Sequence, residues 1–182
     1  MDFRLRQAQR AYEQNRSPEN AERLIGEYQR VLGGFDPSVF SARVVVPEKR
    51  VRDLLTTAIE GGSRHWAMIW RYEFAPGLAY DDFREGGRMQ VPDEYHHPAE
   101  LIPFVPGCAV IIVDANEVHH SYEQLPPDVA EWRLDREALF LGLQVMAEAH
   151  PRHMSDFMEE NEDAETGDVF LQCCLLGGIV YG

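Results

Sequence analysis

Seven acidic residues with no basic residue between them form a densely charged stretch near the end of the chain: Asp156, Glu159, Glu160, Glu162, Asp163, Glu165 and Asp168. Crowded carboxylates can bind a divalent cation or imitate a phosphate backbone, but this acidic run lacks the alternating ligands and central glycine of a calcium-binding loop. A simpler interpretation is a solvated helix junction, in which Asp163 caps a helix and Glu165 lies at its positive end. We predict that the acidic run binds a partner and holds no metal.

A second group of residues places cations beside aromatic rings: Arg64, His65, Trp66, Trp70 and Arg71. An arginine can pair with a phosphate while an indole stacks on a base, so this aromatic-basic set predicts a ligand-binding site for a nucleotide. The alternative is a strand whose aromatic side chains pack in the core and whose arginines lie at the surface.

Histidines and scattered acids supply a third kind of candidate chemistry. His96 or His97 with Asp93 and Glu94 has the ligand types of a metal site, but the spacing is not specific. Glu60 would join such a site if it were buried beside the acidic run, because crowded carboxylates require a shared proton or a cation. No histidine lies near an identifiable serine or cysteine nucleophile, so the sequence predicts no catalytic residue and no cofactor.

The aromatic-basic set lies where a helix gives way to a strand. Apolar residues recur at helical spacing up to Ile59, and Gly61 stands where a left-handed cap would follow, so we expect the helix to end at Glu60. The next residues alternate in the manner of a half-buried strand. In that strand Trp70, Tyr72 and Phe74 are expected to share one face.

The rest of the chain predicts a single α+β domain, residues 35–182, preceded by an N-terminal helical hairpin, residues 1–34. The expected sheet is small and mainly antiparallel, and helices pack on it. Residues 75–107 have no sustained period and predict an irregular excursion with at most short elements. The expected strands are 108–114, its hairpin partner 116–122, a brief edge strand 132–134 and a terminal strand 179–181; the expected later helices follow caps at Asp135 and Asp163.

Composition restricts the partners of the chain. The 182 residues carry a net charge of −14, which disfavours direct binding to a nucleic-acid backbone or an anionic membrane and suits basic partners. The three cysteines show no zinc spacing, and no apolar run is long enough to span a membrane, so we expect a reducing cytoplasm. A homo-oligomer is an open possibility.

Three segments carry a resemblance to a known family: DLLTTAIEGGSRHW, WRLDREALFLGLQVMA and ENEDAETGDVFLQCCLLGGIVYG. They resemble the signature blocks of small uncharacterised proteins frequent in bacteriophage and prophage genomes. The resemblance spans residues 51–182, although the middle excursion is unmatched. It implies a phage origin and a bacterial host cell, but it carries no functional residue over to this chain.

The leading hypothesis is a non-enzymatic phage accessory protein that binds and neutralises a host component. Its acidic run would occupy a basic nucleic-acid channel in a defence protein such as a CRISPR effector. One alternative is a sponge that sequesters a nucleotide immune signal through the aromatic-basic set. The other is a metal-dependent enzyme that uses the clustered carboxylates.

Overall fold

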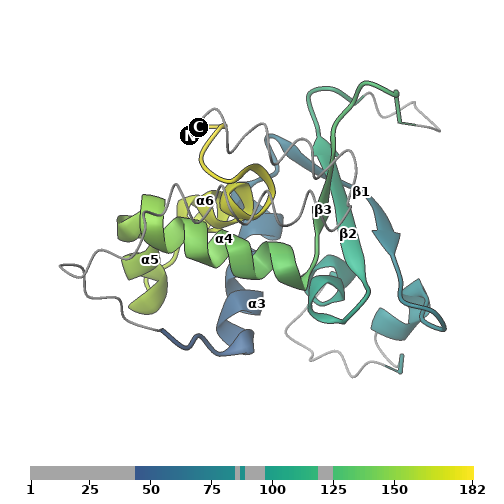
Figure 1. Ribbon diagram of the computed structural model, residues 1–182, viewed down its shortest axis with the longest axis horizontal. Coiled ribbons are helices and arrows are strands. Elements are labelled where there is room, and N and C mark those ends of the chain that lie inside the picture. Colours follow the sequence, from purple (N-terminus) through teal and green to yellow (C-terminus); the bar gives the residue numbers. More distant parts are fainter. Residues whose placement is uncertain (1–43, 85–86, 89–96, 119–124) are drawn as a thin grey trace, which may run out of the picture. The chain divides into compact units, whose positions relative to one another are not determined.

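Figure 1 shows the observed helices and strands. The computed structural model describes residues 44–84, 87–88, 97–118 and 125–182, and Val46–Gly182 forms one unit. The predicted helical hairpin, residues 1–34, lies outside the described residues. The helices are α3 (Glu48–Thr57), α4 (Arg136–Ala149), α5 (Pro151–Met158) and α6 (Ala164–Leu176), the π-helix is η1 (Ala58–Gly62), and the strands are β1 (Ala67–Glu73), β2 (Ala109–Asp114) and β3 (Glu131–Leu134).

The predicted α+β class is confirmed, with a three-stranded antiparallel sheet in the order β1-β2-β3. Strand β2 is buried along its whole length, as its continuous apolar sequence predicts. Val110 and Ile112 lie on the face of β2 that packs against the helices, and Leu134 of β3 lies directly opposite Val110 in the register of the two strands. Figure 1 shows α4 and α6 on this side of the sheet.

Charged side chains cover the other face of the sheet. Ile111 of β2 lies between Arg71 of β1 and Arg133 of β3. Arg71 forms an ion pair of 2.6 Å with Glu131, and Arg133 pairs with Glu73. The long stems of the arginines cover apolar surface while their charged ends pair with acids, which helps to keep Ile111 only 3% exposed.

Strand β1 contains a β-bulge at Trp70, so its side chains do not alternate as expected. Ile69 pairs with Ile112 and Arg71 pairs with Ile111, so Trp70 is an extra residue without a partner on β2. An extra residue changes which side chains face the core, because alternation restarts after it. Tyr72 and Phe74 pack against the core, but Trp70 does not share their alternation, and that prediction was wrong.

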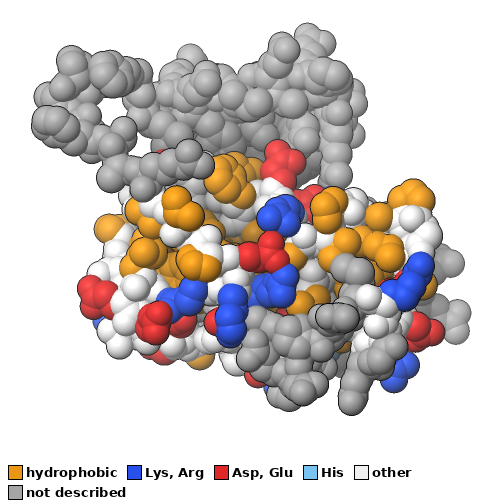
Figure 2. Space-filling view, turned by 90° about the horizontal axis from the view of Figure 1, so that it is seen from below, with side chains coloured by type: hydrophobic (Ala, Val, Ile, Leu, Met, Phe, Trp, Pro, Cys, Tyr) orange, Lys and Arg blue, Asp and Glu red, His pale blue; other side chains and the backbone are white. Residues whose placement is uncertain are grey.

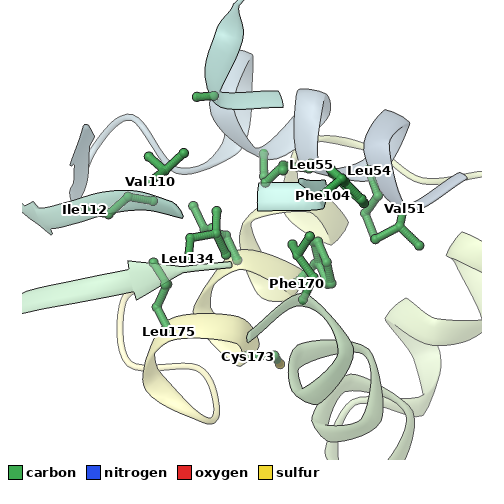
Figure 3. Close-up of a cluster of buried hydrophobic side chains, with 14 of the residues drawn as sticks. Val51, Leu54, Leu55, Phe104, Val110, Ile112, Leu134, Phe170, Cys173 and Leu175 are labelled. Carbon is green, nitrogen blue, oxygen red and sulfur yellow. The ribbon is translucent and has the colours of Figure 1, made fainter. Parts of the chain in front are cut away.

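Helix α6 is the centre of the helical layer. Asp163 caps it as predicted, because its carboxylate accepts the backbone N–H of Thr166 at 2.9 Å. Every residue from Thr166 to Cys173 is buried, so the helix is surrounded by the rest of the molecule. Figure 3 shows Phe170, Cys173 and Leu175 in one cluster with side chains of α3 and of the sheet.

The double glycine after α3 has a different role from the predicted one. The helix does not stop at Glu60; it widens into η1, in which the N–H of Ser63 bonds to the carbonyl oxygen of Ala58 at 3.0 Å. A Cβ atom on Gly62 would lie 2.1 Å from the carbonyl oxygen of Ala164. The glycine therefore permits close approach of η1 to the start of α6, and the left-handed cap expected at Gly61 is absent.

Two predicted strands are also corrected. Asn116 lies in a turn and not in the expected hairpin strand, and β2 pairs with β3 instead. Residues 119–124 lie outside the described part of the chain. Residues 179–181 do not form a strand; the N–H groups of Val180 and Tyr181 instead donate to the side-chain amide oxygen of Gln172. Gly177, by contrast, adopts the left-handed conformation (φ 70°) that ends α6, as expected.

The described parts of the 75–107 excursion contain only short 3-10 turns, as predicted: η2 (Tyr80–Phe83), η3 (Pro98–Glu100) and η4 (Ile102–Phe104). These turns nevertheless belong to the core, because Phe83 and Ile102 are almost fully buried. Among the described residues, no helix has the length and apolar character needed to cross a membrane.

Candidate functional site

The acidic run begins in α5, crosses the connection and continues into α6. Four of its seven carboxylates are exposed, Asp156 and Glu162 are half-buried, and Asp168 is buried. The exposed members are Glu159, Glu160, Asp163 and Glu165. The acidic run is therefore not one cluster, and no group of three or more metal-ligating side chains occurs within the described residues.

Arg50 of α3 fixes the exposed part of the acidic run. Its guanidinium lies 2.7 Å from the carboxylate of Glu160 and 3.3 Å from that of Glu162. It also lies 5.0 Å from the ring centroid of Phe157 and donates a hydrogen bond to the Phe157 carbonyl oxygen. Arg50 thus connects α3 to the connection between α5 and α6.

Glu160 has an unusual backbone conformation for a residue with a side chain. Its φ of 61° is positive, and it is the one non-glycine residue in the described chain with this property. Such a conformation costs about 1–2 kcal/mol for a residue other than glycine. The bond of 2.8 Å from the N–H of Asn161 to the carbonyl oxygen of Asp156 and the ion pair with Arg50 hold it in place.

Two members of the acidic run have structural partners. The backbone N–H of Thr166 bonds to Asp163 and holds the pKa of that carboxyl below its usual value. Asp168 accepts hydrogen bonds of 2.7 Å from the indole N–H of Trp66 and from the amide of Gln172. Asp168 therefore serves the core and is not available to a partner at the surface.

The aromatic-basic set is dispersed. Arg64 and His65 are exposed in the turn before β1, and each contacts a backbone carbonyl of η1. Trp66 is fully buried, Trp70 is half-buried at the bulge, and Arg71 is paired with Glu73 and Glu131. The buried indole of Trp66 offers no free face to a ligand from solution, so these five residues do not form one stacking surface.

A buried polar cluster that the sequence did not reveal surrounds Tyr181. Its ring stacks on Trp66, with centroids 4.9 Å apart and planes 6° apart, and its hydroxyl donates to Asp114. Burial and this hydrogen bond raise the pKa of Tyr181 to about 12. Burial also raises the pKa of Asp114, but hydrogen bonds from Tyr181 and Asn116 outweigh it and keep that pKa below its usual value.

His97 is the described member of the predicted histidine metal site; His96, Asp93 and Glu94 lie outside the described residues. Its Nδ1 accepts the backbone N–H of Ala99 at 3.2 Å, so the neutral ring carries its proton on Nε2. A metal on Nε2 would require the opposite tautomer and would break this bond. Glu60 is exposed, and it lies close enough to His97 for its charge to act on that imidazole.

The charges on the surface are unevenly arranged. Figure 2 shows basic and acidic side chains interspersed on one face of the molecule. On α3 the same mixing is explicit, because Arg52 pairs with Glu48 and Lys49 pairs with Asp53. A surface with mutually paired charges offers little net field. After α5 Glu160 is paired as well, but Arg50 supplies one positive charge against the carboxylates of Glu160 and Glu162, so acids predominate there.

Comparison with known proteins gives no further assignment, since no family model, curated protein or solved structure matches the chain. The resemblance to phage proteins therefore stays a prediction.

Proposed function

We propose that the protein is a non-enzymatic binding protein that uses the exposed acids after α5 to occupy a basic surface of another protein. The observation that carries the proposal is the geometry at Arg50. One partly buried arginine holds Glu160 at the surface, with 77% of its side chain exposed, while Glu159 and Glu165 lie exposed on either side of it in sequence.

Pre-organisation makes this arrangement suited to binding. A flexible acidic segment loses conformational freedom when it binds, which weakens the complex. Here the ion pairs of Arg50 and the cap at Asp163 already restrict the segment before any partner arrives. Complementary positive charge on the partner would then accelerate association. Proteins with an acidic surface would be repelled and would not bind.

The phage origin that the resemblance implies specifies the kind of partner that we propose. A protein with a net charge of −14 would be attracted to the basic channel that a host defence protein uses for nucleic acid, such as that of a CRISPR effector. By filling that channel it would act as a counter-defence inhibitor in the bacterial cytoplasm. The chain's own phosphate-like carboxylates would replace the nucleic acid.

The test compares two variants with equal net charge. The first changes Glu159, Glu160 and Glu165 to Gln. The second changes Glu117, Glu137 and Glu148, which are also exposed, to Gln. Host proteins that bind the unmodified chain are identified by affinity capture and mass spectrometry, purified, and titrated by calorimetry at several salt concentrations.

We expect the first variant to weaken binding by about tenfold or more and to reduce its dependence on salt, because each lost charge pair removes a screened attraction. The second variant should bind as the unmodified chain does. Equal weakening in both variants would show that net charge alone is responsible, and unchanged binding by the first would exclude these acids as the contact surface.

A further inference from the structure

Three aromatic side chains from separate segments meet where β1 ends; we call Tyr72, Tyr80 and His97 the tyrosine–histidine surface. Tyr72 of β1 contacts both of the others, with its ring centroid 5.5 Å from that of Tyr80 and 6.4 Å from that of His97. The rings are tilted by 38° and 46°, so they do not cover one another face to face. Tyr80 is 38% exposed and the other two are half-buried, so ring faces remain open to solvent.

The loop that carries Tyr80 is fixed by its own hydrogen bonds. The carboxylate of Asp82 accepts the backbone N–H of Ala79 at 2.7 Å and the guanidinium of Arg88 at 2.7 Å. Arg88 also donates to the carbonyl oxygen of Gly77 at 2.6 Å. Tyr80 is therefore exposed on a restrained loop, so that a partner can contact its ring without having to order the loop.

The polar groups of this surface are not used by the parts of the chain that the structure describes. There the hydroxyls of Tyr72 and Tyr80 form no hydrogen bond, and the exposed carboxylate of Glu60 forms no ion pair. Glu60 lies close enough to His97 for its charge to raise the pKa of that ring, but burial lowers the pKa more, so the ring is neutral at pH 7. One negative charge thus lies, without an opposite charge, beside aromatic rings.

Glu60 also adjoins the exposed acids at the start of α6. It belongs to η1, and a Cβ atom on its neighbour Gly61 would lie 3.6 Å from the Cβ atom of Ala164. Asp163 and Glu165 are the residues on either side of Ala164, and both are exposed. The tyrosine–histidine surface therefore borders the acids that the proposed function assigns to a basic partner.

We propose that Glu60 and the tyrosine–histidine surface bind an arginine side chain of that basic partner. The aliphatic stem of the arginine lies along Tyr80 and Tyr72, and its guanidinium stacks on His97 and pairs with Glu60. Arginine suits this surface better than lysine does, because a planar guanidinium can stack on a ring and donate hydrogen bonds in its own plane. A phosphate would be repelled by Glu60, so a nucleotide fits less well. The inference rests on the proposed function for the basic character of the partner.

The test titrates the full-length chain with two blocked peptides, Gly-Arg-Gly and Gly-citrulline-Gly, because citrulline has the shape of arginine without its charge. NMR spectroscopy follows the ring protons of Tyr80 and His97. The arginine peptide should shift both signals in a saturable manner and bind at least about fivefold more tightly than the citrulline peptide. Equal binding of the two peptides, or no shift at either ring, would overturn the proposal. A saturable shift with adenosine monophosphate in place of the arginine peptide would assign the surface to a nucleotide instead.

Substitutions locate the bound arginine. Glu60→Gln and Tyr80→Ala should each weaken binding of the arginine peptide by about threefold or more. The matched controls at other exposed positions, Glu148→Gln and Phe140→Ala, should bind it as the unmodified chain does. Undiminished binding in both Glu60→Gln and Tyr80→Ala would place the peptide elsewhere on the molecule and contradict the assignment.

The variant with Glu159→Gln, Glu160→Gln and Glu165→Gln separates this inference from the proposed function. It should still bind the arginine peptide, because Glu60 and the three rings are unchanged. If the unmodified chain binds the peptide at these rings but captures no host protein, the tyrosine–histidine surface stands and the proposed function fails. If the unmodified chain binds a host protein through the three acids but does not bind the peptide, only the inference about arginine fails.

Discussion

The ring of Tyr181 lies flat against the indole of Trp66, although the two residues are separated by most of the described chain. The indole N–H of Trp66 bonds to Asp168 of α6, and the hydroxyl of Tyr181 bonds to Asp114 at the end of β2. This pair of rings therefore connects the sheet, the central helix α6 and the residues that follow α6. Its consequences can be measured.

Tyr181→Phe should lower the free energy of unfolding by about 1–2 kcal/mol at neutral pH, because the variant leaves Asp114 without its hydroxyl donor. Stability should also depend on alkaline pH. Since the pKa of folded Tyr181 is raised to about 12, the unfolded chain loses its proton first, and stability falls as pH rises from about 10 towards 12.

Urea denaturation at a series of pH values measures both effects. Tyr181→Phe should have a shallower decline at alkaline pH than the unmodified chain. Tyr80→Phe provides the matched control, because Tyr80 is 38% exposed. Identical behaviour of the two variants would argue against a bonded Tyr181.

Gly62→Ala should lower the free energy of unfolding by about 1–3 kcal/mol or more, because its Cβ would lie 2.1 Å from the Ala164 carbonyl oxygen. Gly61→Ala should change it by less than about 0.5 kcal/mol, since its Cβ would meet only Ala164 Cβ at an ordinary 3.6 Å. Thermal and urea unfolding of both variants distinguish the observed packing from the expected cap. A costly Gly61→Ala and a harmless Gly62→Ala would favour the cap.

Arg50→Met should lower the free energy of unfolding by about 2 kcal/mol, because it removes the ion pairs to Glu160 and Glu162 and the bond to the Phe157 carbonyl. The exposed Arg64→Met is the control and should have an effect within about 0.5 kcal/mol. Hydrogen exchange should accelerate at Glu159–Asn161 in the Arg50 variant. Unchanged exchange there would show that Arg50 does not fix the acidic connection.

Acid should destabilise the junction of α4 and α5 through His150. Burial, and then the neighbouring His153, lower the pKa of His150, whose Nε2 has no hydrogen-bond partner among the described residues. The folded state therefore favours the neutral ring. Its stabilisation is complete above the ordinary pKa of about 6.5 and is lost as pH falls through that value towards the lower folded pKa.

The check is the midpoint of urea unfolding measured between about pH 7.5 and 5. His150→Gln should reduce the loss of stability over this interval, because glutamine does not titrate. His65→Gln, at an exposed position, should leave the loss as it is. An equal loss in the unmodified chain and in His150→Gln would show that other groups control the acid response.

Sequence patterns predicted the elements whose signals are local. Asp135 and Asp163 begin α4 and α6 because each carboxylate accepts backbone N–H groups within three residues, and such caps are visible in a sequence. The continuous apolar sequence of β2 likewise indicated a buried strand. The α+β class followed from these elements.

Contacts between distant segments could not be predicted in this way. The two double glycines are alike in sequence, yet Gly177 takes the left-handed cap while Gly62 makes room for Ala164, which is 102 positions later. The bond between Trp66 and Asp168, which are 102 positions apart, could not be predicted for the same reason. In the candidate site, the cap at Asp163 was predictable, whereas the role of Arg50 required the fold.

The bulge at Trp70 also bears on solubility. Among the described residues β1 pairs only with β2, so its other side is an outer edge of the sheet, and regular outer edges can recruit strands from other molecules. The extra residue interrupts the regular spacing of N–H and C=O groups along β1. An incoming strand would meet mismatched hydrogen-bonding groups beside the charges of Arg71 and Glu73, so β1 is poorly suited to start aggregation.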